Sequence, residues 1–367
     1  MQIADIRVSV HQFAPILPLI GRSMGDSLRV LCEVETADGL CGLGMTGRFL
    51  AHGVAAAIER HLAPVLRGLD PRDLEAIHAR LQPVVSERGQ MTGVNLAALS
   101  CVDLALWDLI GKASGRTVAQ LLGGHKDRAQ VYVTYGFGAY DRDQLVEMAR
   151  RLMAQGHTRL KVLVGVAKGG IVEDAARVRH VREAVGDAVT LAIDANESLG
   201  LEAAKRLCHL LEDLDLAWFE DPLARCDARD MGVLRRSTAI PLSAGQMDGH
   251  SRRFREWLDH DAIDVFMPNS MYNGGMTETR RVAYLAQIHN RPLSDAGGGG
   301  IFCLHHVAGF RNGTLAECHL GVEQVEDAIF TNAPKPEGGE LAVPSAPGWG
   351  VALNREVVKE TLVAAET

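Results

Sequence analysis

Three short stretches decide the fold of this chain: LAIDAN (191–196), WFEDP (218–222) and PLSAGQ (241–246). Each begins with an apolar run that is typical of a β-strand and ends in a side chain that carries oxygen. Asp194, Glu220 and Gln246 follow one another at equal intervals of 26 residues. One strand, one helix and two loops fill such an interval, so the spacing predicts successive βα units.

The oxygen-bearing residues at the ends of these strands predict a common metal site. In a parallel barrel, the carboxyl ends of neighbouring strands converge on one mouth. The carboxylates of Asp194 and Glu220 and the amide oxygen of Gln246 are the kind of ligands that Mg²⁺ prefers. The sequence therefore predicts a site for a hard cation such as Mg²⁺. An alternative stays open, in which Asp194 and Glu220 are mouth carboxylates with other partners.

Length and composition limit the possible partners. A chain of 367 residues is long enough for a barrel and a second domain. The net charge of −8 is spread without a basic run, which argues against nucleic acid and anionic membrane surfaces as partners. The N-terminus lacks the pattern of a signal peptide, and no apolar run is expected to span a bilayer. Seven cysteines without a CxxC pair favour reduced thiols and a cytoplasmic protein.

The first third of the chain predicts a separate α+β domain over residues 1–125. Residues 1–50 alternate apolar and polar side chains, and a DG turn at 38–39 predicts a hairpin. The intervening segment 15–26 is rich in Pro and Gly, and we expect a surface connection there, with a flap over a site as the alternative. Residues 95–114 have the spacing of a long buried helix.

Strands and helices alternate over the remainder of the chain. Eight apolar segments between residues 128 and 320 predict strands, and amphipathic helices separate them. We therefore predict a modified (β/α)8 TIM-type barrel over residues 126–322, and absence of its last helix is one alternative. The tail, residues 323–367, is rich in Pro and Gly, and we expect it to pack back on the N-terminal domain.

Several motifs resemble those of the enolase superfamily, specifically its mandelate racemase and muconate-lactonizing enzyme group. The motifs occur in order through nearly the whole chain: SCVDLALWDLIGKASGRTVAQLLGG (100–124), IDAN (193–196), FEDP (219–222), SAGQ (243–246) and MPNSMYNGG (267–275). The resemblance implies an α+β capping domain over the mouth of the barrel and a homo-oligomer. It also implies that Asp194, Glu220 and Gln246 hold Mg²⁺.

The resemblance also implies a reaction class. Such proteins remove a proton next to a carboxylate and stabilise the resulting enediolate, with Mg²⁺ and a Lys or His base. For this chain it implies a Mg²⁺-dependent lyase or isomerase, of the dehydratase or racemase type, that acts on a small hydroxy- or sugar-acid carboxylate. Three further residues would orient the metal ligands without binding the metal: Asn196, Asp221 and Asn269.

The residues that the group uses as acids and bases are partly replaced in this chain. Leu163 stands where a second lysine is usual, and Ala296 stands where racemases have a histidine. Asn269 replaces an acidic or basic residue, and Gln246 replaces the usual glutamate, although its amide oxygen can still bind a metal. The usual acid–base pair is therefore absent.

Four residues remain as candidates for catalysis. Lys161 is expected either to pair with the substrate carboxylate or to act as the base, if burial lowers its pKa. Glu317 occupies the position of a carboxylic acid that hydrogen-bonds the enediolate. Asp295 and Tyr272 are possible substitutes for the missing groups, although one step along a strand normally reverses the direction of a side chain such as that of Asp295.

Two other functions are alternatives to this enediolate chemistry. A protein that kept the fold and binds a carboxylate ligand without turnover would explain the replacements at 163, 269 and 296. The retention of Lys161 and Glu317 argues against it. A nicotinamide-dependent barrel has no support, because the GGGG run at 297–300 is not a GxGxxG motif between a strand and a helix.

Overall fold

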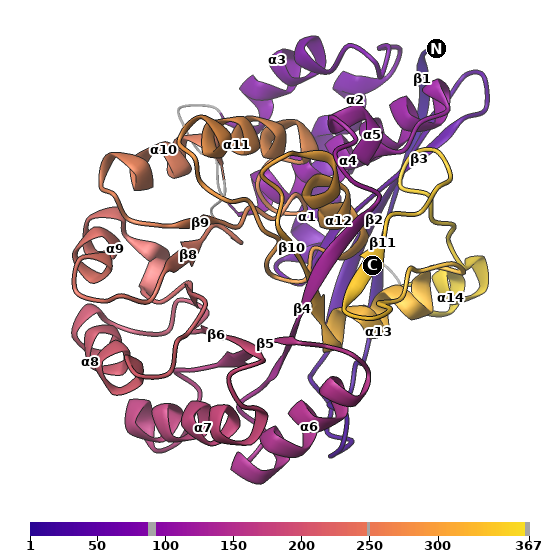
Figure 1. The fold of residues 1–367 in the computed structure, drawn as a ribbon. Coiled ribbons are helices and arrows are strands. Elements are labelled where there is room, and N and C mark those ends of the chain that lie inside the picture. The colour runs from indigo at the N-terminus through magenta and orange to yellow at the C-terminus, as the bar shows by residue number, and fades with distance from the viewer. Residues whose placement is uncertain (87–92, 248–249, 364–367) are drawn as a thin grey trace.

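The N-terminal domain, here called the cap, is an antiparallel sheet with helices packed on it. The computed structural model describes residues 1–86, 93–247 and 250–363 (Figure 1). Strands lie in the order β1-β2-β3, which confirms the predicted hairpin. The elements of the cap are β1 (Ile3–Phe13), β2 (Ser27–Thr36), β3 (Cys41–Gly47), α1 (Ala51–Ala57), the π-helix η1 (Ile58–Leu62), α2 (Ala63–Leu66), α3 (Leu74–Val85), α4 (Val94–Ser114) and α5 (Val118–Leu122).

Helix α4 is the buried helix that the sequence predicts over 95–114, and it packs directly on β3. Glycines in β3 allow this approach, since a Cβ at Gly44 would lie 1.8 Å from the carbonyl oxygen of Cys101. By length and composition α4 could cross a membrane, contrary to the expectation from the sequence. In its most apolar window, however, 83% of the residues are buried inside the protein. The apolar character of α4 therefore reflects its place in the core.

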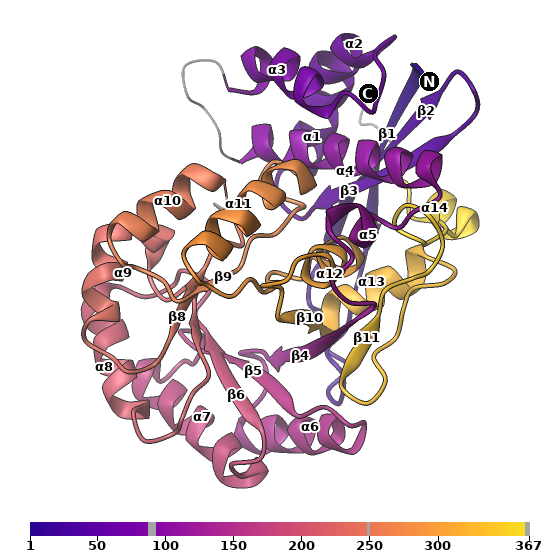
Figure 2. The same ribbon diagram turned by 45° about the horizontal axis from the view of Figure 1, so that its top comes forward.

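The second domain is the barrel that the βα spacing predicts. Its strands run in parallel in the order β10-β4-β5-β6-β7-β8-β9, and helices surround them (Figures 1 and 2). The strands are β4 (Arg128–Gly136), β5 (Arg159–Leu163), β6 (Thr190–Asp194), β7 (Phe219–Glu220), β8 (Leu242–Ala244), β9 (Val265–Phe266) and β10 (Leu315–His319). The helices between them are α6 (Arg142–Ala154), α7 (Gly170–Val185), α8 (Leu201–Leu211), the 3₁₀ turn η3 (Ala224–Cys226), α9 (Ala228–Arg235), α10 (Ser251–Asp259), α11 (Met276–Ile288) and α12 (Gly300–Gly309).

The seventh strand of the barrel is reduced to a single position. The sequence predicts a strand over 291–297, but Leu293 alone forms bridges, to Phe266 on one side and to Gly313 on the other. Asp295 extends the contact between this segment and β10, because its amide donates to the carbonyl of Leu315. A glycine run follows at once, and its conformational freedom does not favour an extended strand.

The barrel has its last helix, which the sequence analysis did not predict. Helix α13 (Leu320–Ile329) follows β10 directly and crosses the boundary that we expected at 322 and 323. Strand β11 (Glu340–Ala342) then pairs with β4. The alternative of a missing helix is wrong because the Pro- and Gly-rich composition of the tail begins only after residue 330.

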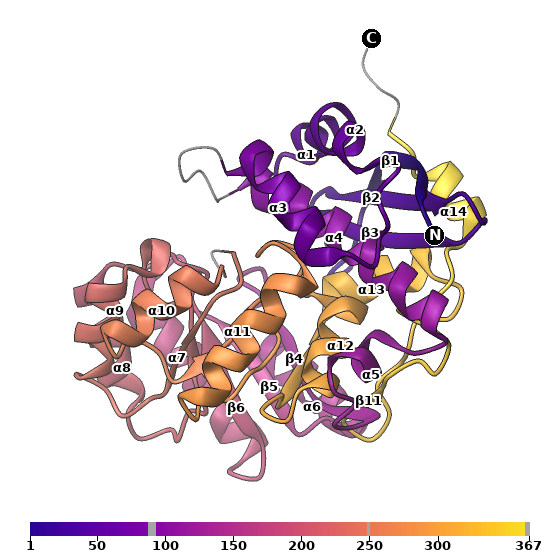
Figure 3. The same ribbon diagram turned by 90° about the horizontal axis from the view of Figure 1, so that it is seen from above.

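The C-terminal segment returns to the cap, as Figure 3 shows for α14 (Arg355–Glu360) beside the three-stranded sheet. The amide of Val363 donates to the carbonyl of Val10. The amide of Trp349 donates to the carboxylate of Asp108 in α4 over 2.9 Å, and its indole NH donates to the carbonyl of Leu43. Both ends of the chain therefore contribute to the cap.

Candidate active site

Lys161 occupies the centre of the barrel mouth, and three carboxylates from other strands surround it. Its Nζ lies 2.6 Å from Glu220 Oε2, 3.1 Å from Asp194 Oδ2 and 3.1 Å from Glu317 Oε1. Asp194 and Glu220 are direct register partners on β6 and β7, which explains why equal spacing in the sequence brings them together. The Lys161 side chain is fully buried. Four of the residues selected from the sequence thus form one cluster.

Charge in this cluster is unbalanced. Burial alone would lower the pKa of Lys161, but the carboxylates of Glu220, Glu317 and Asp194 raise it well above the usual value. A role for Lys161 as base requires a lowered pKa, and the surrounding carboxylates reverse that shift. Burial raises the pKa of both Asp194 and Glu220. One ammonium group therefore neutralises three carboxylates only in part.

Glu317 is the carboxylate of the cluster that is held most firmly. Its Oε1 accepts a hydrogen bond from the Thr134 hydroxyl, and its Oε2 accepts one from the amide of Gly298. Burial opposes the charge on Glu317, but Lys161 and these hydrogen bonds lower the pKa of the carboxyl to about 2. Glu317 is therefore ionised at neutral pH and fixed in position.

A small cavity of about 30 Å³, here called the mouth cavity, lies beside the cluster. Its lining consists of Arg48, Thr134, Leu163, Asp194, Asn196, Gln246, Gly297, Glu317 and His319. Such a volume holds about one or two water molecules. A larger ligand can therefore bind only if the cap moves. Sequence reasoning missed Arg48 and His319. The alternation of a strand could have revealed His319, since it follows Glu317 by two positions on β10 and shares its face.

The other predicted catalytic residues lie outside the mouth cavity. The Asp295 carboxylate accepts from the amide of Glu317 over 3.2 Å, and its second oxygen, Oδ1, has no hydrogen-bond partner in the described structure. Tyr272 is buried against the edge of Phe49, with ring centroids 6.4 Å apart. Asn269 donates to the carbonyl of Ala296 and accepts from the amide of Met271. Asn269 therefore supports the loop that carries Ala296.

The residues that follow Asp194 and Glu220 lie in tight turns at the ends of β6 and β7. Asn196 and Asp221 have positive φ angles of 45° and 39°, which are uncommon for residues other than glycine. The amide of Asn196 donates to Asp194 Oδ1 over 2.8 Å and orients that carboxylate. Asp221 lies one residue beyond Glu220, and Cys226 Sγ lies 3.6 Å from its Oδ1.

The buried Asp221 leads to a prediction about pH. Burial, and then the charge of Asp194, raise the pKa of Asp221 to about 8. The folded protein then keeps a proton that the unfolded chain releases near pH 4. The stability that this group contributes is therefore lost as pH rises from about 4 to about 8. We expect the melting temperature of Asp221→Asn to exceed that of the wild type by an amount that grows from pH 5 to pH 8.5, with a chelator present. A pH-independent difference between the two proteins would contradict this assignment.

Segment 15–26, the cap loop, docks on the barrel at the same end as the mouth cavity. Ile16 and the Gln324 amide exchange two hydrogen bonds of 3.0 and 2.9 Å, and the Tyr140 hydroxyl donates to the carbonyl of Pro18 over 2.7 Å. Tyr140 follows β4 and Gln324 belongs to α13, so both lie near the carboxyl ends of barrel strands. The expected plain surface connection is therefore a segment tied to the barrel.

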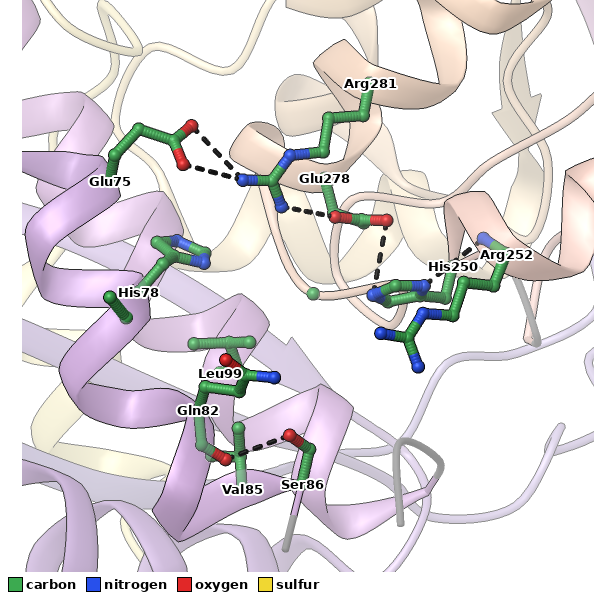
Figure 4. A pocket seen from close by; sticks show the side chains of 12 residues that line it. Glu75, His78, Gln82, Val85, Ser86, Leu99, His250, Arg252, Glu278 and Arg281 are labelled. Atoms are coloured by element: carbon green, nitrogen blue, oxygen red, sulfur yellow. Dashed lines mark hydrogen bonds and ion pairs between the residues drawn. The ribbon is translucent and has the colours of Figure 1, made fainter. Parts of the chain in front are cut away.

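A larger cavity of about 370 Å³ lies between the cap and the barrel but contains none of the predicted residues (Figure 4). Helices α3 and α4 form one side, and α10 and α11 form the other. Arg281 joins the two domains here, because its guanidinium contacts Glu75 at 3.0 Å and Glu278 at 2.8 Å. His250 lies 3.3 Å from Glu278. The Arg281–Glu75 pair therefore joins the barrel to the cap at this cavity.

The donor set at the mouth fits a divalent cation. Among the described residues, no three His, Cys, Asp or Glu side chains form a ready metal cluster. The predicted ligands are instead two carboxylates and the Gln246 amide, which lies against Gly297 and is 6% exposed. Glu220 Oε1 is buried without any hydrogen-bond partner in the described part of the chain. An orphaned carboxylate oxygen beside excess negative charge is well suited to Mg²⁺.

Comparisons with known proteins agree with the fold. Residues 6–123 match the mandelate racemase / muconate lactonizing enzyme N-terminal domain, and residues 144–357 match the enolase C-terminal domain-like family. The chain is 31% identical to an arabinonate dehydratase from Saccharolobus solfataricus, over 90% of both proteins. It is 28% identical to a D-galactarolactone cycloisomerase from Agrobacterium fabrum, over 98% of both.

A solved structure is equally close. The L-talarate dehydratase from Polaromonas sp. JS666, complexed with Mg and L-glucarate, superposes with a TM-score of 0.88 at 30% identity, over 99% of this chain and 98% of the other. Relatives named as dehydratases and cycloisomerases thus share the cap, the barrel and their order along the chain. On these matches and on its fold, this chain belongs to the mandelate racemase/muconate lactonizing enzyme family of the enolase superfamily.

Proposed function

We propose that the protein is a Mg²⁺-dependent lyase or isomerase that acts on a sugar-acid carboxylate. The observation that carries this proposal is the buried cluster of Lys161 with Asp194, Glu220 and Glu317 at the barrel mouth. A purely structural barrel gains nothing from three carboxylates around one lysine, because burying charge costs free energy. The relatives named as sugar-acid dehydratases and a cycloisomerase support the same class.

Each residue of the cluster has a proposed part in the reaction. Asp194, Glu220 and Gln246 would hold Mg²⁺, which supplies positive charge where the substrate carboxylate gains a second negative charge. Lys161 would bind that carboxylate through its ammonium group, and it would take the proton from the adjacent carbon only if bound Mg²⁺ offsets the carboxylates that raise its pKa. Glu317, held by Thr134 and Gly298, would lie beside the reacting atoms. A homo-oligomer and a cytoplasmic location remain predictions from the sequence.

Deuterium exchange tests this function without knowledge of the product. The Mg²⁺-loaded protein is incubated in D₂O with a panel of aldonic and aldaric acids, and proton NMR follows loss of the signal at the carbon next to the carboxylate. We expect exchange, or conversion to a 2-keto acid, for at least one member of the panel. Mg²⁺ binding without exchange for any acid would favour the alternative, a protein that binds a carboxylate without turnover.

Gln246 gives a separate test of the metal site. Gln246→Glu should tighten Mg²⁺ binding to the metal-stripped protein by tenfold or more, since a unit charge ~4 Å away at an effective dielectric of ~20 contributes about 4 kcal/mol. Titration calorimetry measures the change. Gln287→Glu, at an exposed position on α11, provides the control, because it adds the same charge outside the cluster. An unchanged affinity in Gln246→Glu would show that residue 246 does not bind the metal.

A further inference from the structure

The larger cavity between the cap and the barrel has the dimensions of a small-molecule site. Its volume is about 370 Å³, against about 30 Å³ for the mouth cavity, and pockets of this size hold small ligands. Ala79, Val85 and Leu99 contribute apolar surface, and polar side chains from both domains contribute the remainder. A largely apolar wall with a few polar groups is typical of ligand sites. The proposed function gives this cavity no role.

The two glutamates at this cavity are already matched by cations. Glu75 contacts two arginines of α11, Arg281 at 3.0 Å and Arg280 at 3.5 Å. Glu278 contacts Arg281 at 2.8 Å, and it also accepts a hydrogen bond of 2.8 Å from the amide of Ser251. Two arginines therefore balance two glutamates, and neither carboxylate needs a further cation.

His78 on α3 presents a hydrogen-bond donor from the cap side. Its Nε2 lies 2.6 Å from Oδ1 of Asp103, a fully buried carboxylate on α4. Burial opposes a charge on the imidazole, but the hydrogen bond and the charge of Asp103 raise the pKa of His78 above its usual value. The ring points into the cavity (Figure 4), and Nδ1 has no hydrogen-bond partner among the described residues. The imidazolium of His78 therefore offers Nδ1–H to a ligand.

Arg252 presents a cation from the barrel side. It is the second residue of α10, and its side chain is exposed. Its neighbour Arg253 contacts Glu256 at 2.7 Å, whereas Arg252 forms no ion pair within the part of the chain that the structure describes. The guanidinium of Arg252 extends into the space between α10 and α3 (Figure 4). Because the carboxylates nearby have other partners, Arg252 is a cation in excess at this cavity.

We propose that the larger cavity binds a small organic oxyanion, a carboxylate or a phosphate ester, whose charged group lies between Arg252 of the barrel and His78 of the cap. A guanidinium matches such a group with two parallel hydrogen bonds, and Nδ1–H of His78 adds a third. The apolar side chains of the cavity would cover the body of the ligand. Since the ligand would contact both domains, its binding should stabilise the folded protein. This site is separate from the mouth cavity and does not depend on the proposed function.

Binding of three small probes to the Mg²⁺-loaded protein tests the proposal. Benzoate and phenyl phosphate carry an oxyanion on an apolar ring, and benzyl alcohol carries the same ring without a charge. By titration calorimetry, we expect at least one anion to bind tenfold or more tightly than benzyl alcohol, and the tighter of the two identifies the charged group. Arg252→Met should weaken binding of that anion by tenfold or more, whereas Arg252→Lys should retain part of it. His78→Gln should weaken it as well.

Matched variants separate this cavity from other anion sites. Arg255→Met removes an exposed arginine about one turn further along α10 and should leave binding unchanged. Arg48→Met removes the arginine of the mouth cavity and should also leave it unchanged. Binding that is lost in Arg48→Met but kept in Arg252→Met would place the anion at the mouth and overturn the inference. Anions that bind no more tightly than benzyl alcohol would overturn it too. Because Arg252 is exposed, its variant decides the question even if His78→Gln fails to fold.

Discussion

Replacing Lys161 with methionine should reduce turnover by roughly 10²–10⁴-fold, the usual contribution of a positioned acid–base group. The same variant should destabilise the metal-free protein by about 3–5 kcal/mol, because three buried carboxylates then lose their cation. Mg²⁺ should restore much of this stability, since the divalent ion neutralises the same carboxylates. Steady-state rates and thermal melts with and without Mg²⁺ measure both effects on one protein.

Lys126→Met is the matched control for this variant. Lys126 is half-buried and donates to the carbonyls of Gly313 and Thr314, away from the carboxylate cluster. Its loss should leave turnover and the Mg²⁺ dependence of melting unchanged. Near-normal turnover in Lys161→Met would show that Lys161 serves only to balance charge, and a different residue would then have to move the proton.

Asp194→Asn should weaken Mg²⁺ binding by on the order of 10²–10³-fold, since loss of a unit charge ~4 Å from the ion costs about 4 kcal/mol at an effective dielectric of ~20. The asparagine keeps an oxygen that can accept from the Asn196 amide, so the turn after β6 should persist. Activity should fall with the metal affinity and recover in part at high Mg²⁺ concentration. Titration calorimetry on the metal-stripped protein measures the affinity directly.

Asp143→Asn on α6 makes the same chemical change on the outside of the barrel. The Asp143 side chain is 97% exposed, so its loss should leave Mg²⁺ binding as it is in the wild type. Equal affinities in Asp194→Asn and the wild type would place the metal elsewhere, and the proposed function would lose its cofactor site.

Much of the fold follows from periodicity and spacing alone. Equal intervals of 26 residues predict neighbouring βα units, and the register of β6 with β7 places Asp194 beside Glu220 accordingly. The alternation over residues 1–50 predicts the cap sheet, because one face of each strand is buried. Local patterns suffice here, since each of these elements buries a face that the sequence marks as apolar.

Other features depend on contacts between distant residues, and the sequence did not reveal them. The raised pKa of Lys161 arises from carboxylates that are far away in the chain. Arg48 meets Gly297 across 249 positions, and no local pattern marks that pair. The strand expected at 291–297 is reduced to Leu293, because the glycine run that follows does not favour an extended strand. Charge and loop geometry at the mouth are products of the tertiary structure.

The return of the C-terminal segment to the cap constrains how the protein can fold as it is synthesised. The buried Asp108 carboxylate needs the amide of Trp349, which leaves the ribosome 241 residues later. Until then the cap sheet, although complete in sequence, has an open edge and an exposed apolar face beside α4. Barrel units can form one after another during translation, whereas the domain made first is finished last. A nascent chain truncated before Trp349 should therefore contain a protected barrel and a protease-sensitive cap.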